Sequence, residues 1–341
     1  MSKQRYVNYT GILHEKWAIV LHMGLSEEQV LGGLFGVCIG DALGVPVEGC
    51  SRFFLKRNPV QGFGYSGISR RVPDGWWSDD SSLTLCTAES LVETGKKGID
   101  LRDMGNRFCM WLHEGHWTPG GKAFGIGYTT AEALERIRSG VAPQQAGGRD
   151  EYSNGNGSLM RILPLALYLF GERGGDSFEQ VHDVSSITHG HPRSHVACGI
   201  YVQFAQHLLV GDGLQQSYEA TKREVVCRYQ VTLYREELAH YARVLEGDIS
   251  CLDEHDVRSS GYVVDTLEAS LWCLLSGRSF GESVLNAVNL GGDTDTTGAV
   301  TGGLAGLLYG FRSIPTAWLD RVARRDDILD LGRRLLQSIS S

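Results

Sequence analysis

The chain has 341 residues, of which 42% are hydrophobic, so it can bury a large core. Its formal net charge is −8 and no basic cluster stands out, so we do not expect nucleic acid as a partner. The apolar runs at 30–39 and 299–308 are shorter than the roughly 20 residues that cross a bilayer. We therefore expect neither export nor insertion into a membrane.

The eight cysteines form no Cys-x-x-Cys pair, and most of them lie inside apolar patterns with helical spacing. This distribution is typical of reduced thiols packed in the core of a cytoplasmic protein. We therefore expect a cytoplasmic protein that has no disulfide framework and no structural zinc site.

Residues 1–25 stand apart from the rest of the chain. The segment 6–13 is apolar and aromatic, but it precedes the first convincing core helix. We interpret 1–25 as an N-terminal extension, which either packs on the domain or serves as an arm for a partner. Residues 26–341 are expected to form one domain, because no linker or internal repeat divides them.

The domain reads as a succession of helices. Ser26 followed by Gln29 forms a capping box, which predicts a helix start. Apolar residues then recur with helical spacing in several stretches, including 83–91, 196–208 and 264–274, and sustained alternation with period two is nearly absent. The sequence therefore predicts an all-α fold, a compact orthogonal multi-helix array with functional loops at helix ends.

Two further stretches carry structural signals. Glycine recurs every four residues from Gly298 to Gly310, which predicts a last core helix with one nearly bare face for close packing. Several glycines and polar residues at 140–157 predict a long loop, which is a candidate wall of a substrate site.

Two acidic segments lie far apart in the sequence, and each precedes an apolar pattern. Clustered carboxylates repel one another unless they are protonated or bind a cation. Both segments offer only oxygen ligands, which Mg²⁺ and Mn²⁺ prefer. The sequence therefore predicts a cation site that joins them. Their candidate ligands are Ser78, Asp79, Asp80, Asp293, Asp295 and Thr296.

These segments belong to a larger pattern. Five motifs follow one another at 33–49, 78–81, 155–161, 188–189 and 291–296. In this order they resemble the ADP-ribosylglycohydrolase family, which includes dinitrogen reductase-activating glycohydrolase and ADP-ribosylarginine hydrolases. The resemblance implies an all-α fold, two Mg²⁺ or Mn²⁺ ions, and cleavage of ADP-ribose from protein side chains or small acceptors.

The resemblance also assigns roles to residues. It makes the six candidate ligands above the metal ligands, with Ser78 in place of the family's usual threonine. A base for the attacking water is still needed, and Glu48 is our candidate, with Asp80 and Asp293 as rivals. A lone glutamate in a loop is usually only solvated, so this role of Glu48 depends on the resemblance.

The expected substrate contacts come from three places. Asn156, Gly157 and Ser158 form a turn that we expect to lead into a helix, where a diphosphate could bind. His189 matches the family's histidine near the ribose or the metal-bound water. Phe124 is a candidate to stack on adenine, although such a residue is more often part of the core.

Two nearby stretches are interpreted differently. His113 to His116 lacks the i, i+4 histidine spacing of a helical zinc motif, so we expect a loop with solvated histidines. Gly125 stands where many relatives that act on ADP-ribosylarginine have an aspartate. A role of that carboxylate in recognising guanidinium is therefore absent here or supplied elsewhere.

The expected function is removal of mono-ADP-ribose from a modified protein, with arginine as the first candidate acceptor. Serine-linked ADP-ribose and O-acetyl-ADP-ribose are alternatives that the motifs do not separate. A different class is an immunity protein that binds an ADP-ribosyltransferase toxin through residues 1–25. A purely structural relative is disfavoured, because the full set of carboxylates and hydroxyls is present.

Overall fold

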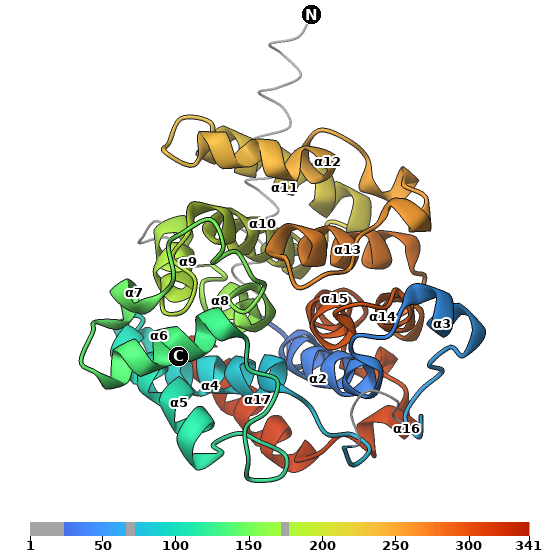
Figure 1. The fold of residues 1–341 in the computed structure, drawn as a ribbon, viewed down its shortest axis with the longest axis horizontal. Helices are drawn as coiled ribbons and strands as arrows, with labels where there is room; N and C mark the ends of the chain where they lie inside the picture. The colour runs from blue at the N-terminus through green and yellow to red at the C-terminus, as the bar shows by residue number, and fades with distance from the viewer. Residues whose placement is uncertain (1–23, 66–71, 172–176, 341) are drawn as a thin grey trace, which may run out of the picture.

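The computed structural model describes residues 24–65, 72–171 and 177–340 (Figure 1). Within these residues the chain consists of helices joined by short turns, and its extended pairings are two isolated bridges, Gly148 with His189 and Gly155 with Tyr262. The predicted all-α fold is confirmed. The apolar segment 6–13 and nearly all of the N-terminal extension lie outside the described residues.

The helices are α2 Glu27–Gly44, α3 Arg52–Arg57, α4 Asp79–Thr94, α5 Leu101–Glu114, α6 Tyr128–Arg138, α7 Pro143–Ala146, α8 Leu163–Tyr168, α9 Ser177–Ser186, α10 Pro192–Val210, α11 Leu214–Tyr229, α12 Ala242–Leu245, α13 Val263–Ser276, α14 Phe280–Asn289, α15 Thr294–Tyr309, α16 Thr316–Leu319 and α17 Arg325–Ser340. The central pair is α2 and α15 (Figure 1). Helices α10, α13 and α14 pack on α15, whereas α4 and α17 pack on α2.

Glycines allow α2 and α15 to touch backbone to backbone. A Cβ on Gly36 would lie 2.0 Å from the carbonyl oxygen of Gly302, and a Cβ on Gly302 would lie 2.1 Å from that of Gly36. The pairs Gly32–Gly306 and Gly40–Gly298 are equally close. The predicted bare face is therefore confirmed along α15, but Gly310 lies beyond its end. This contact brings the end of α2 beside the start of α15, where the acidic residues lie.

The first core helix begins as predicted. Ser26 caps α2, and its side chain and that of Gln29 form the reciprocal capping box. The segment Glu27–Val47 has 21 residues with hydropathy 1.8, so by length and composition it could cross a bilayer, which the shorter run at 30–39 did not suggest. However, 94% of its apolar window is buried inside the protein, as in the core helix of a globular fold.

Two expectations about the order of helices need correction. The stretch 140–157 is not one continuous loop, because α7 interrupts it. Helix α15 is not the last core helix, since α17 follows and buries Ile328, Leu331 and Leu335 against α2 and α4. The polar residues of α17 make it strongly amphipathic, and an amphipathic helix can cover a core without a long apolar run.

A candidate metal centre and its pocket

Three segments bring aspartates to one place. Asp41 lies in the last turn of α2, Asp79 and Asp80 begin α4, and Asp295 lies in the first turn of α15. Carboxylate oxygens of Asp41, Asp80 and Asp295 all lie within 4.8 Å of one another. The two acidic segments that the sequence predicted to meet therefore do meet, and α2 contributes an additional carboxylate.

The turn before α15 explains the glycine pair in the second segment. Gly291 and Gly292 have φ of +76° and +73°, which side chains rarely tolerate. A Cβ on Gly292 would lie 2.2 Å from the carbonyl oxygen of Ser259. The turn is closed by the backbone N–H of Asp293, which donates to that same oxygen at 2.8 Å. Only glycine at both positions lets the chain place Asp293 at the edge of the pocket.

Asp41 is the site residue that the sequence analysis left without a role. Its carboxylate accepts hydrogen bonds from the backbone N–H groups of Ser78 and Ser81, each at 2.9 Å, and from the hydroxyl of Ser81 at 2.6 Å. It thus fixes the start of α4 beside α2. Burial raises its pKa to about 6. The available signal was one carboxylate inside the otherwise apolar segment 30–47, which is costly unless it has partners.

Asp79, Asp80 and Asp295 are buried, and no basic side chain in the described part of the chain forms an ion pair with them. Burial first, and then the neighbouring carboxylates, raise the pKa of Asp79 to about 8 and those of Asp80 and Asp295 well above the usual range. Asp80 Oδ2 accepts a hydrogen bond from Ser78 Oγ at 2.8 Å, but Asp80 Oδ1 is buried and has no partner within the described chain. An unpartnered oxygen among close carboxylates fits a hard divalent cation.

The cluster opens into a pocket of about 240 Å³. Nine of its lining residues were predicted from the sequence, namely Glu48, Asp79, Asp80, Asn156, Gly157, His189, Asp293, Asp295 and Thr296. Tyr128, Thr129 and Gly261 also line it, and no sequence signal pointed to them. Most of the predicted site is therefore gathered around one cavity.

Three predicted residues do not line this pocket. Ser78 is the N-cap of α4, and its hydroxyl bonds to Asp80. Ser158 is fully buried, and its hydroxyl accepts a hydrogen bond from Ser185 Oγ at 2.9 Å. Phe124 is half-buried in the segment before α6. Ser78 thus contacts the pocket through its hydrogen bond to Asp80. The Ser158 hydroxyl is instead hydrogen-bonded to Ser185 in the interior of the protein.

Asn156 orients one of the carboxylates. Its side-chain Nδ2 donates to Asp293 Oδ2 at 2.7 Å and to Thr266 Oγ1 at 2.9 Å. Its backbone N–H donates to the carbonyl oxygen of Gly261 at 3.0 Å, so that amide is not free for a diphosphate. The helix expected directly after this turn is a 3₁₀ turn, Leu159–Arg161, followed by α8. The structure thus shows Asn156 holding Asp293.

Two histidines lie close together but differ in their contacts. His189 is 2% exposed and lines the pocket, and its Nδ1 lies 2.9 Å from Thr188 Oγ1. Burial, together with the charge of Arg161, lowers the pKa of His189 to about 3. His191 instead caps α10 by accepting a hydrogen bond from the backbone N–H of Arg193 at 3.1 Å. Only His189 therefore belongs to the pocket.

Gly125 adopts a backbone conformation that excludes side chains. Its φ is +91°, and a Cβ there would lie 2.3 Å from Asp79 Oδ1. Asp79 thus occupies the space into which a side chain at 125 would grow. A carboxylate at this position could not be accommodated without moving either the backbone or Asp79.

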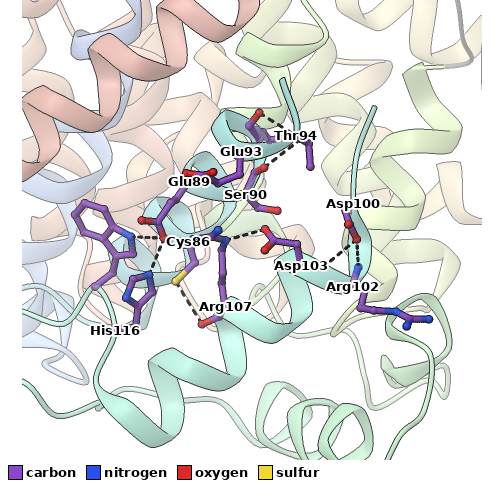
Figure 2. A network of polar contacts seen from close by, with 12 residues as sticks. Cys86, Glu89, Ser90, Glu93, Thr94, Asp100, Arg102, Asp103, Arg107 and His116 are labelled. Carbon is purple, nitrogen blue, oxygen red and sulfur yellow. Dashed lines mark hydrogen bonds and ion pairs between the residues drawn. The ribbon is translucent and has the colours of Figure 1, made fainter. Parts of the chain in front are cut away.

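Further along α4, Glu89 has a very different environment (Figure 2). Glu89 Oε2 accepts hydrogen bonds from Arg107, from His116 Nε2 at 2.7 Å and from Trp117 Nε1 at 3.1 Å. Burial acts to raise its pKa, but the bond from His116 and the charge of Arg107 outweigh burial and lower it to about 2. The expectation of solvated histidines is therefore wrong for His116, whose partner lies 27 residues away in the sequence.

This network also supports the loop before the aspartate cluster. Trp77 is fully buried, and its Nε1 donates to the backbone oxygen of Trp117 at 3.1 Å. Ser78 and Asp79 follow Trp77 directly. The Glu89 network, defined here as Glu89, Arg107, His116 and Trp117, is therefore connected to the start of α4 through one tryptophan.

Comparison with known proteins supports the same assignment. A family model described as ADP-ribosylglycohydrolase matches residues 24–341. The ADP-ribosylarginine hydrolase Tri1 of Pseudomonas putida (strain GB-1) is 32% identical over 316 residues, covering 91% of this chain and 80% of the relative. The Tri1 protein of Serratia proteamaculans (strain 568) is 30% identical over 311 residues, covering 91% and 79%.

Two further matches cover nearly complete proteins. The ADP-ribosyl-(dinitrogen reductase) glycohydrolase of Rhodospirillum rubrum is 30% identical over 307 residues, covering 87% of this chain and 90% of the relative. A solved chain of an ADP-ribosylglycohydrolase-related protein complex superposes with a TM-score of 0.74 and 33% identity, covering 92% of this chain and 98% of the other. The chain therefore belongs to the ADP-ribosylglycohydrolase family.

Proposed function

We propose that this enzyme is a Mg²⁺-dependent hydrolase that removes mono-ADP-ribose from modified protein side chains, with arginine as the acceptor. The observation that carries the proposal is the pocket in which buried, uncompensated aspartates from three helices meet. The family assignment supports the glycohydrolase chemistry, and the names of two relatives support arginine.

The residues present fit two divalent cations. Asp79, Asp80, Asp293 and Asp295 would hold them, with hydroxyl oxygens from Ser78 and Thr296 as further ligands. Divalent cations bound there would bind the cis-diol of the distal ribose and lower the pKa of a bound water. The unpartnered Oδ1 of Asp80 and the absence of a basic side chain within 4.0 Å of these carboxylates, in the described part of the chain, support this assignment.

The side chains of the pocket account for the rest of the reaction. Cleavage of the bond at the anomeric carbon builds up positive charge, which nearby carboxylates stabilise. Water adds to that carbon, and the acceptor nitrogen leaves with a proton. We propose Glu48 as the base that takes the proton from water, because it lines the pocket at the end of the 3₁₀ turn Val45–Val47.

The other two candidate bases are less well suited. Asp293 already accepts a hydrogen bond from Asn156, which holds its carboxylate in a fixed direction. Asp80 accepts one from Ser78 and lies in the centre of the aspartate cluster, where a cation would hold it. Both are better placed as ligands than as proton carriers. The distinction can be tested by the pH dependence of kcat in Glu48→Gln.

One observation favours a second acceptor. Position 125 has no room for the carboxylate that could face a guanidinium, because Asp79 fills that space. Serine-linked ADP-ribose and O-acetyl-ADP-ribose need no such carboxylate, since their acceptor is an oxygen. They are therefore the alternative substrates to screen.

Protection against an ADP-ribosyltransferase toxin is a separate part of the proposal. It is supported by the apolar and aromatic segment 6–13, and its toxin-binding arm would lie in residues 1–25. Removing these residues and measuring toxin binding tests the arm. Unchanged affinity and unchanged protection would contradict it, whereas hydrolysis should be unaffected by the deletion.

The experiment for the hydrolase measures release of ADP-ribose from arginine-modified protein and from serine-linked substrate in parallel. We expect release from the arginine-linked substrate that requires Mg²⁺ and is lost in Asp80→Ala. Release from the serine-linked substrate alone would change the acceptor but keep the chemistry. No release from either substrate in Mg²⁺ or Mn²⁺ would contradict the proposed function.

A further inference from the structure

Behind the pocket lies a buried chain of hydrogen bonds that has no role in the reaction proposed above. It runs from Arg161, in the 3₁₀ turn before α8, through Thr188 to His189. Arg161 Nη2 lies 2.8 Å from Thr188 Oγ1, and Thr188 Oγ1 lies 2.9 Å from His189 Nδ1. All three residues are at most 2% exposed, so water does not compete for these bonds.

The first bond has only one possible direction. A guanidinium carries donors and no acceptor, and Arg161 stays protonated at neutral pH even though burial lowers its pKa to about 10. Thr188 Oγ1 must therefore accept from Arg161. Arg161 is held in place by a second bond to the carbonyl oxygen of Val184 at 3.2 Å and by the ring of Phe108, 4.6 Å from its Cζ.

The second bond then has one direction as well. The Thr188 hydroxyl has one proton, and within the described chain its only acceptor is His189 Nδ1. If Nδ1 carried a proton instead, that hydroxyl would be buried with an unsatisfied donor, which is unfavourable. The hydroxyl therefore donates to Nδ1, and the imidazole proton lies on Nε2.

The Nε2 atom faces the glycine loop of the pocket. A Cβ on Gly157 would lie 2.8 Å from His189 Cε1 and 3.4 Å from Nε2, and a Cβ on Gly155 would lie 3.5 Å from Nε2. The two glycines thus leave room for the ring edge. Nε2 itself has no hydrogen-bond partner among the described residues, and His189 lines the pocket.

We propose that Arg161 and Thr188 are positioning residues that fix the Nε2–H tautomer of His189, so that this histidine only donates, to an oxygen of the ADP-ribosyl group. The substrate part of this inference depends on the proposed function, whereas the tautomer does not. His189 is accordingly not the base that activates water, which agrees with a carboxylate in that role. The low pKa of His189 is consistent with a ring that stays neutral throughout.

The tautomer of His189 can be measured directly by NMR. In protein labelled with ¹⁵N at its histidines, protonated and unprotonated ring nitrogens give well-separated signals, and His189→Gln identifies the signals of His189. We expect a protonated Nε2 and an unprotonated Nδ1 in the wild type, without substrate or Mg²⁺. A protonated Nδ1 would overturn the proposal, and this test needs no variant of Thr188 to fold.

Variants then test the two positioning residues. Thr188→Val removes the hydroxyl at similar volume, and we expect a mixture of tautomers and a fall in kcat/KM of about tenfold, the factor that one hydrogen bond supplies. Thr188→Ser keeps the hydroxyl and should restore both. Arg161→Met removes the obligatory donor, so Thr188 can donate or accept, and the tautomers should mix again.

The outcomes separate the two proposals. A Thr188→Val protein with an unchanged tautomer, or with a changed tautomer and unchanged kcat/KM, would overturn the positioning role. A folded Thr188→Val should also keep the wild-type Mg²⁺ affinity, and a loss would mean that the residue acts on the metal centre instead. If the wild type showed the Nε2–H tautomer but released no ADP-ribose, the proposed function would fail while the tautomer stood.

Discussion

The start and the middle of α4 hold acidic side chains in opposite ways. At its start, Asp79 and Asp80 are buried among other carboxylates, and their pKa values are raised. In its third turn, Glu89 is surrounded by Arg107, His116 and Trp117, and its pKa is lowered to about 2 (Figure 2). The charge of Glu89 is neutralised by basic side chains of the protein, whereas Asp79 and Asp80 need protons or cations from solution.

This difference separates a structural role from a functional one. A carboxylate that the chain itself neutralises stabilises the fold in any buffer. Carboxylates without a partner destabilise the metal-free protein and become favourable only when a cation binds, because binding to the folded state adds to its stability. Carboxylates on one helix therefore affect the stability of the metal-free protein in opposite directions, and experiments can test that difference.

The largest effect is expected from Asp80→Asn. This change removes a carboxylate from the centre of the cluster, so we expect kcat/KM to fall by at least about a hundredfold. The metal-free protein should become more stable by on the order of 1 kcal/mol, because the buried carboxyl, whose Oδ1 has no partner in the described chain, no longer has to hold a proton. Turnover assays and chemical denaturation in chelator measure the two changes, with exposed Asp326→Ala as the control.

An Asp80→Asn protein that lost stability in chelator would contradict this view of the cluster. Such a loss would mean that the Asp80 carboxylate is compensated by the protein, as Glu89 is. Wild-type helicity by circular dichroism would show that lost turnover does not result from unfolding.

Gly125→Ala introduces one carbon into the same cluster. The new Cβ would start 2.3 Å from Asp79 Oδ1, and φ of +91° is itself strained for alanine. We expect this variant to bind Mg²⁺ at least about tenfold more weakly than the wild type. A loss of this size is comparable to losses of affinity in other proteins whose metal ligands are disturbed. Isothermal titration with Mg²⁺ measures the affinity.

Gly127→Ala is the matched control for that experiment. It lies two residues away, has φ of −74°, and a Cβ there would meet nothing within 4 Å. Its Mg²⁺ affinity should equal that of the wild type. Equal losses in both variants would show that the close contact with Asp79 is not the cause.

Glu89→Gln removes the one of these α4 carboxylates whose charge the chain itself compensates. At neutral pH we expect a loss of about 2 kcal/mol in unfolding free energy, because Arg107 and His116 lose their charged partner. The folded pKa of about 2 lies below the ordinary 4.5. This stabilisation is therefore present above pH 4.5 and disappears as the pH falls toward 2. Denaturation of both proteins across this range measures the difference.

The contrast between wild type and Glu89→Gln should therefore vanish in acid. A difference that stays constant down to about pH 2 would mean that shape and packing, not charge, explain the loss. Turnover per folded molecule should remain close to the wild type if the network only supports the fold.

The smallest effect concerns pH and metal together. The folded pKa of Asp79 is about 8 in the absence of metal, so the folded state holds a proton that the unfolded state has lost. Metal-free stability should therefore fall as pH rises toward 8, and stabilisation by Mg²⁺ should grow as protons stop competing. We expect the rise in Tm on adding Mg²⁺ to be a few degrees larger at about pH 8.5 than at about pH 6.5.

Comparing each pH with and without Mg²⁺ cancels the titration of other groups, such as His182 and His195, whose pKa values burial lowers to about 4 and about 3. A rise in Tm that is independent of pH would contradict a raised pKa of Asp79 at the proposed cation site.

The sequence by itself determined the class of fold and most of the pocket. Capping at Ser26, helical spacing and the glycine stripe are local signals, so they can be recognised without knowing the tertiary contacts. The closely spaced carboxylates at Asp79–Asp80 and Asp293–Asp295 also predicted a cation site, because clustered negative charges are unfavourable in a folded protein unless a cation neutralises them.

Only the tertiary structure decided which distant groups meet. Asp41 looks like an isolated polar residue in an apolar helix until its carboxylate is found against Ser78 and Ser81. His116 looks like a loop histidine until Glu89 is found beside it. The hydrogen bonds from Arg161 through Thr188 to His189 acquire a direction only because burial excludes water from them. These properties depend on contacts between residues far apart in the chain, which short-range patterns do not encode.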